Sequence, residues 1–155
     1  MIFIAGNVPS LKNGKVKGIY HPKTVTKYLR SLNIQSYSAS KGIVKGYKDP
    51  NKPNLFIEQI GDYFKDPSYP LIIGTHFVRN SKRRFDVINA QQIIFDLMTA
   101  HHYLPDDNAN YVIPVSFKIN GKWFSIDKEN PGVWLKRLDP KDFLDVKMKI
   151  LQEHK

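Results

Sequence analysis

Short runs of apolar residues alternate along the chain with breaks rich in Gly, Pro and Asn. The run Ile2 to Ala5 predicts a strand that Gly6–Ser10 ends, because Gly, Asn and Pro interrupt regular structure. Residues 71–78 predict a second strand between Pro70 and a polar run. Residues 111–119 are expected to form another strand, and residues 123–126 are a further candidate.

The clearest helical pattern runs from Asp86 to about His101. Its apolar residues recur at helical spacing on one face, namely Val87, Ala90, Ile94, Leu97 and Met98. Polar residues fall on the opposite side, namely Asn89, Gln92 and Asp96. Asp86 stands where an N-cap belongs, directly before the apolar pattern. The segment is therefore predicted to be an amphipathic helix capped by Asp86.

Shorter helices are expected at residues 22–32 and 55–64, and after Asp139, which is followed by Pro140 in the order of a capped helix start. Residues 35–54 are rich in Ser, Gly, Lys and Pro and are predicted to form a long basic loop. Because strands and helices are interspersed without a repeat or a linker, we expect one α+β domain, residues 1–155. Its sheet should be mixed and largely antiparallel, with helices packed on it.

Composition excludes several classes of protein. The chain has no cysteine, which removes disulfides, thiolate nucleophiles and cysteine-ligated zinc. It has no apolar run long enough to span a bilayer, and the apolar start lacks the basic region of a signal peptide. We therefore expect a protein of a reducing cytoplasm with no membrane partner.

Charge gives the first indication of function. The net charge is +10, and residues 1–57 contain ten Lys and Arg residues against the single acid Asp49. A second basic cluster is Lys82-Arg83-Arg84. Phosphates supply the dense negative charge that such a surface attracts, so nucleic acid is the expected partner. The alternative interpretation is a solvated surface that keeps the protein soluble.

Acidic residues are scarce here, which makes their positions informative. Asp86 follows the basic cluster, and Asp106 and Asp107 follow the helix that Asp86 begins. A straight helix of about sixteen residues is about 24 Å long, so Asp86 and Asp107 can meet only if the chain folds back after Ala100. Carboxylates that converge can hold Mg²⁺, which activates water and stabilises charge on a phosphodiester.

Each acidic residue also has a purely structural interpretation. Asp86 can simply be a helix cap, and Asp106-Asp107 before Asn108 can be an Asx turn. The histidines show no zinc-ligand spacing, and the chain has neither a Walker-type phosphate loop nor a serine nucleophile elbow. The residues alone therefore indicate a basic α+β protein that binds nucleic acid, and they leave nuclease activity open.

Several motifs together resemble the RusA family of Holliday-junction resolvases. The stretch Arg83–Asn89 is similar to the family's basic run and D-x-D-N motif, and the Asp106-Asp107 pair follows at the family's interval. Between them lie Gln92 and the element Phe95-Asp96-Leu97, also at matching positions. Gly6–Asn13 resembles the family's N-terminal P-S-x-x-N loop, and Asn130–Val133 resembles a C-terminal element of phage-borne relatives.

The resemblance implies a homodimer that binds four-way DNA junctions and cuts them with Mg²⁺ or Mn²⁺, in a bacterium or a phage-infected host. It implies Asp86 and Asp107 as the catalytic residues. The metal ligands would be Asp86, Asp107, Asp106 and Asn89. The DNA contacts would be Lys12, Asn13, Lys15, Lys82, Arg83, Arg84 and Gln92.

Two positions depart from the family pattern. Ile88 replaces the second Asp of D-x-D-N and cannot bind a metal, and Gln92 stands where the family has Lys. Asp106 is the expected substitute ligand, with Asn89 as an alternative, while Asp96 lies farther along the helix. Two other functions therefore stay open, a branched-DNA-binding protein that has lost catalysis and a nuclease that acts on flaps.

Overall fold

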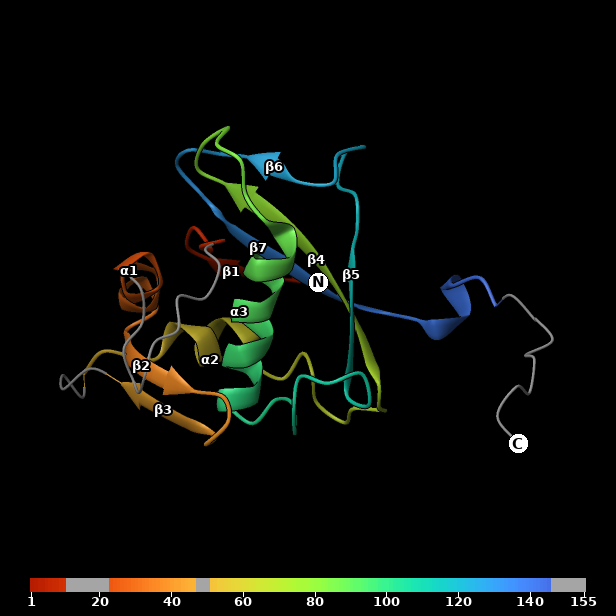
Figure 1. The fold of residues 1–155 in the computed structure, drawn as a ribbon, viewed down its shortest axis with the longest axis horizontal. Coiled ribbons are helices and arrows are strands. Elements are labelled where there is room, and N and C mark those ends of the chain that lie inside the picture. The colour runs from red at the N-terminus through yellow and green to blue at the C-terminus, as the bar shows by residue number, and fades with distance from the viewer. Residues whose placement is uncertain (11–22, 47–50, 146–155) are drawn as a thin grey trace, which may run out of the picture.

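The computed structural model describes residues 1–10, 23–46 and 51–145, and its centre is a mixed β-sheet (Figure 1). The strands follow the order β1-β7-β4-β5, and β6 pairs with β4 beyond the end of β5. Strand β7 is antiparallel to both neighbours, whereas β4 is parallel to β5 and β6. The bounds are β1 Ile2–Ala5, β4 Leu71–Arg79, β5 Val112–Ser116, β6 Ser125–Ile126 and β7 Gly132–Leu138.

Helix α3 (Val87–Ala100) lies against the sheet, which confirms the predicted α+β class (Figure 1). Asp86 is its N-cap, as predicted. The shorter helices are α1 (Lys23–Ser31) and α2 (Leu55–Ile60), and the predicted cap Asp139 begins the 3₁₀ helix η1 (Pro140–Asp142). None of the helices in the described ranges is long and apolar enough to cross a membrane.

The core lies between β4 and α3. Strand β4 is paired on both edges and almost all of its residues are buried. The apolar face of α3 packs against it, and Ala90, Ile94, Leu97 and Met98 are fully buried. Val87, predicted on the same face, is instead 37% exposed at the start of the helix. That exposure leaves an apolar side chain at the surface beside Asp86.

The long loop predicted over residues 35–54 is wrong in its first part. Strands β2 (Ile34–Ser38) and β3 (Ile43–Gly46) form an antiparallel hairpin there. The side chains of Ile34 and Ser36 are buried and that of Gln35 is exposed, which is the alternation of a strand. Gly42 adopts φ +60° in the connecting turn, a conformation that glycine allows at little cost. Polar composition masked this alternation in the sequence.

Gly132 is predicted to be essential for the pairing of β1 with β7. A Cβ at this position would collide with the ring of Phe3 and lie 2.5 Å from the backbone oxygen of Ile4. Gly132→Ala should therefore lower the free energy of unfolding by about 1–3 kcal/mol, measured by urea denaturation. Gly46→Ala is the control, because a Cβ there meets no described atom within 4 Å. Equal stability of the two variants would contradict the prediction.

Candidate functional site

Asp86 is an exposed carboxylate at the N-terminus of α3. Its Oδ1 atom accepts hydrogen bonds from the backbone N–H groups of Ile88 (3.0 Å) and Asn89 (3.2 Å). These bonds satisfy two of the donors that a helix start leaves without partners. The cap interpretation of Asp86 is thus confirmed, and its negative charge also sits at the positive end of the helix dipole.

The loop Gly6–Ser10 is fastened to this end of α3 and to the end of β4. The amide of Asn89 donates to the carbonyl of Ser10 (3.5 Å), and the guanidinium of Arg79 donates to the carbonyl of Val8. The backbone N–H of Asn80 donates to Oδ1 of Asn7 (3.1 Å). Two motif segments about eighty residues apart in sequence therefore meet in space. Lys12, Asn13 and Lys15 lie outside the described residues.

The segment between β4 and α3 carries the basic cluster. Lys82, Arg83 and Arg84 are all exposed, and they directly precede Phe85 and Asp86. Ile88 follows and is 70% exposed, which is unusual for so large an apolar side chain. This end of α3 therefore combines exposed cations, one carboxylate and exposed apolar groups.

A polar row continues along α3 from Asp86. Positions three and four apart share a helix face, so Asn89, Gln92 and Asp96 line up on one side. Gln92 is exposed, and Asn89 and Asp96 are half-buried. We call Asp86, Asn89, Gln92 and Asp96 the polar row. Gln91 does not belong to it, because it is buried and donates to the hydroxyl of Thr75 (2.8 Å).

The far end of the polar row holds a pair of carboxyl groups. The side chains of Asp96 and Asp107 are hydrogen-bonded to each other. Burial, together with the hydrogen bond and negative charge of Asp107, raises the pKa of Asp96 to about 7. Two carboxylates in contact repel each other, so the pair holds a proton near neutral pH. Burial also raises the pKa of Tyr37 on β2, with a further contribution from the charge of Asp96.

Asp106 turns the chain beside this pair. Its Oδ1 accepts from the backbone N–H of Asp107 (2.8 Å) and its Oδ2 accepts from the side chain of Asn108 (3.2 Å). The hydrogen bond from the backbone N–H of Asp107 is the largest of the contacts that hold the pKa of Asp106 below its usual value. Neither bond to Asp106 comes from the backbone N–H two residues on, which defines an Asx turn, so the Asx-turn interpretation of Asp106 stays a prediction. That bond is formed at Asn108, whose Oδ1 accepts from the backbone N–H of Asn110 (2.9 Å).

The predicted meeting of Asp86 and Asp107 is not found within the chain. After α3 the chain does fold back, and the N–H groups of Tyr103 and Leu104 both donate to the carbonyl of Met98. This turn brings Asp107 only as far as Asp96. Asp96 lies ten residues beyond Asp86, which is about 15 Å along the helix axis.

The predicted magnesium ligands therefore do not form one site in the described part of the chain. Asp86 and Asn89 lie at one end of the polar row, and Asp106 and Asp107 lie at the other. Among the described residues, no group of three or more His, Cys, Asp or Glu side chains could hold a metal ion. Asp96, the least favoured substitute ligand, is the residue that contacts Asp107.

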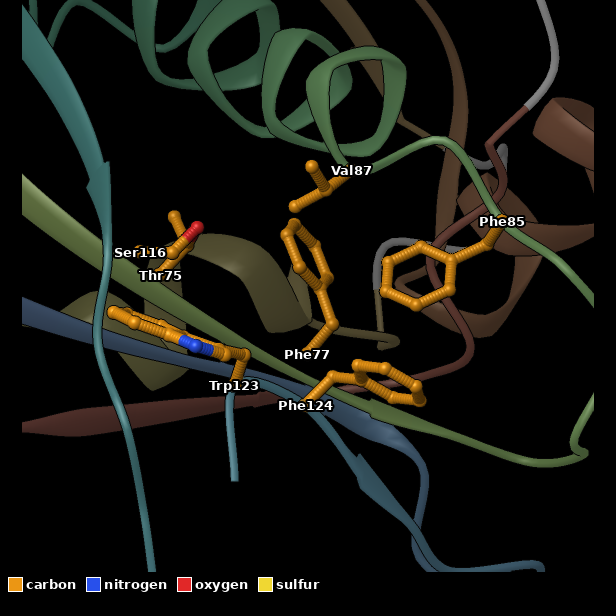
Figure 2. Close-up of a pocket in the computed structure, with 7 residues that line it drawn as sticks. All are labelled: Thr75, Phe77, Phe85, Val87, Ser116, Trp123 and Phe124. Carbon is orange, nitrogen blue, oxygen red and sulfur yellow. The ribbon is translucent and has the colours of Figure 1, made fainter. Parts of the chain in front are cut away.

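An aromatic pocket beside Asp86 was missed by sequence reasoning. It has a volume of about 340 Å³ and lies between β4, the start of α3 and the connection from β5 to β6 (Figure 2). Its lining residues are Thr75, Phe77, Phe85, Val87, Ser116, Trp123 and Phe124. The available signal was the dipeptide Asn120-Gly121, which favours a tight hairpin turn just before the two adjacent aromatic residues.

The Asp96–Asp107 pair should make stability depend on pH. Because the pKa of Asp96 rises from 3.8 to about 7 on folding, the folded chain holds a proton that the unfolded chain releases in this interval. The free energy of unfolding should therefore fall as pH rises through it, by at most about 1.4 kcal/mol per pH unit for one proton.

The measurement is urea unfolding between pH 4 and 8 in the presence of a chelator. The free energy of unfolding of each variant is plotted against pH and its slope is compared with that of the unaltered protein. Asp96→Asn should lose the slope, whereas Asp107→Asn should weaken it, because burial still raises the pKa of Asp96 in that variant. Glu58→Gln, which changes an exposed carboxylate on α2, should keep it. A slope that persists in Asp96→Asn would show that another group is responsible.

Comparisons with known proteins do not assign a family. No family model matches the sequence, no curated protein matches it, and no solved structure matches the fold. The resemblance to RusA-type resolvases therefore rests on the motif residues alone.

Proposed function

We propose that this protein is a metal-dependent endonuclease of the RusA type that acts on branched DNA, with four-way junctions as the expected substrate. One observation carries the proposal. The loop Gly6–Ser10, the basic cluster Lys82–Arg84 and the residues Asp86 and Asn89, which carry the resemblance in sequence, lie together at one end of α3. The loop and the segment Lys82–Asn89 are more than seventy residues apart in sequence, and their contact in space supports a shared site.

The basic cluster is proposed to hold the DNA backbone. Its three cations are exposed and lie in a chain with a net charge of +10. Lys and Arg side chains displace counterions from phosphates, which gives strong but sequence-independent binding. Gln92, Lys12, Asn13 and Lys15 are proposed as further contacts.

Asp86 and Asp107 are the proposed catalytic residues, and their separation bears on how they act. Because they lie at opposite ends of the polar row, a centre that contains both needs either two chains or a movement of residues 101–107. We favour two chains. In a symmetric dimer each residue occurs once in each copy, so Asp86 of one copy can lie beside Asp107 of the other.

A second candidate function is the binding of branched DNA without cleavage. It is favoured by exposed Ile88 at the position of the family's second aspartate, and by the lack of a three-ligand group among the described residues. A nuclease specific for flaps is a third possibility that only a panel of substrates separates from the first.

Junction cleavage is the direct test. The protein should cut a synthetic four-way junction in Mg²⁺ or Mn²⁺, and Asp86→Asn should bind the junction without cutting. Asparagine is as good an N-cap as aspartate, so this variant removes the charge and keeps the helix start. Asp86→Ala serves as the structural control and should lose about 1 kcal/mol of stability.

The outcomes separate the candidates. Cleavage that survives in both Asp86→Asn and Asp107→Asn would exclude the proposed catalytic residues. Tight junction binding by the unaltered protein, without cleavage and without calorimetric Mn²⁺ binding, would select the second candidate. If two chains complete the centre, mixing Asp86→Asn with Asp107→Asn should restore part of the nicking activity, because mixed dimers contain one intact centre.

Salt dependence tests the basic cluster. The variant with Lys82, Arg83 and Arg84 all changed to Ala should bind junctions more weakly and with a shallower dependence on salt. Each lost phosphate contact lowers the slope of log affinity against log salt by about 0.9. The matched control changes the exposed residues Lys128, Lys136 and Lys141 to Ala and should keep most of the slope. Fluorescence anisotropy at several salt concentrations measures both, and equal slopes would contradict the assignment.

A further inference from the structure

The aromatic pocket has a defined framework although one of its walls is exposed. We call the segment Phe117–Ser125, which carries Trp123 and Phe124, the outer wall. Figure 2 shows Phe77 and Phe85 on one side and Trp123 and Phe124 on the other, with Val87 above them. The rings of Phe77 and Phe85 meet edge to face at 6.1 Å, and those of Phe85 and Phe124 do so at 5.2 Å. Such contacts stabilise a defined arrangement of rings.

Buried His76 anchors both ends of the outer wall. Its Nδ1 donates to the carbonyl of Phe117 (3.0 Å), and its Nε2 is hydrogen-bonded to the hydroxyl of Ser125 (2.7 Å). Between these anchors the chain reverses at Asn120-Gly121, where Ile119 and Lys122 exchange backbone hydrogen bonds of 3.0 and 3.1 Å. The side chains of Trp123 and Phe124 are 57% and 45% exposed, yet their backbone is held in place.

Cations lie beside the aromatic rings. The Nζ atom of Lys118 is 5.0 Å from the centroid of the Trp123 ring. The guanidinium carbon of Arg79 is 4.6 Å from the centroid of Phe85, but Arg79 is buried and donates to Val8, so it supports the ring from behind. The exposed side chain of Lys122 lies on the same hairpin turn. A partner that packed an apolar surface onto these rings would gain little binding energy from the neighbouring cations. Aromatic rings interleaved with cations are instead the pattern that binds the bases and phosphates of single-stranded nucleic acid.

The size and lining of the pocket limit the ligand further. A volume of about 340 Å³ is near the lower end of the range for ligand pockets, so one flat ring system suits it better than a helix or a peptide. One wall offers the exposed hydroxyl of Ser116, which can hydrogen-bond the edge of a base. The hydroxyl of Thr75 beside it is bonded to Gln91. The other walls are apolar or aromatic.

We propose that this pocket receives one unstacked nucleobase of a bound DNA strand, with the adjoining phosphates held by Lys118 and Lys122. Val87 lines the pocket and is next to Asp86, so the captured nucleotide would lie close to the proposed cleavage residue. The inference rests on the proposed function and refines it. It predicts that the protein prefers DNA with an unpaired base at the branch over fully paired duplex.

Tryptophan fluorescence tests the pocket. The chain has two tryptophans, and Trp134→Phe leaves Trp123 as the only tryptophan, which can be excited selectively over the tyrosines. A single-stranded oligothymidylate should quench this emission, because a base stacks on the indole, whereas a duplex of the same length should not. Trp123→Ala and Phe124→Ala should each weaken oligothymidylate binding about tenfold. Phe143→Ala is the matched control, since Phe143 is 43% exposed and lies outside the pocket.

Several results would overturn the inference. Unchanged emission would show that no base binds in the pocket. Equal affinity of Trp123→Ala and the unaltered protein for oligothymidylate would show the same. A dimer that dissociates in sedimentation on Trp123→Glu would show that a second copy of the chain covers this face. If only these tests fail while changes to Lys82–Arg84 still weaken junction binding, the proposed function stands. If the unaltered protein binds no DNA at all, both proposals fall.

Discussion

Buried polar side chains of β4 hold the parts of the candidate site together. A buried polar group without a hydrogen bond is costly, so each such residue fixes the position of whatever satisfies it. Arg79 binds the carbonyl of Val8, His76 binds both ends of the segment from Phe117 to Ser125, and Thr75 accepts from Gln91 of α3. One central strand thereby positions the N-terminal loop, the outer wall of the aromatic pocket and the helix that carries the polar row.

Much of this architecture could be predicted from local patterns. Helix α3 and its Asp86 cap were predictable because helical periodicity and capping involve residues only a few positions apart. The hairpin of β2 and β3 was missed, since the alternation at Ile34–Ser36 is short and lies in a polar, lysine-rich stretch. The pairing of Asp107 with Asp96 instead of Asp86 depends on how tightly the chain turns at Met98–Leu104, and this tertiary detail leaves no periodic signal.

The distribution of carboxylates distinguishes this chain from the family pattern it resembles. Near the Asp86 end of the polar row, Ile88 stands where the family pattern has an aspartate. Three acidic residues, Asp96, Asp106 and Asp107, lie at the other end. Neighbouring carboxylates repel one another even in a chain of net charge +10. A proton held by the pair of Asp96 and Asp107 reduces that repulsion. The two ends of the row thus differ in charge, in burial and in proton content.

The position of β7 between β1 and β4 has a consequence for biosynthesis. Strand β1 is synthesised well before its partner in the sheet, because that partner is Gly132–Leu138, more than a hundred residues later in the chain. A nascent chain can pair β4 with β5, but it cannot join β1 to the sheet until β7 has been made and inserted between them. In a product truncated before Gly132, β1 would have no partner strand, and the loop Gly6–Ser10 that follows it would not be anchored to the sheet through β1. Assembly of this end of the molecule therefore has to wait until β7 has been synthesised, although β1 and β4 are made earlier.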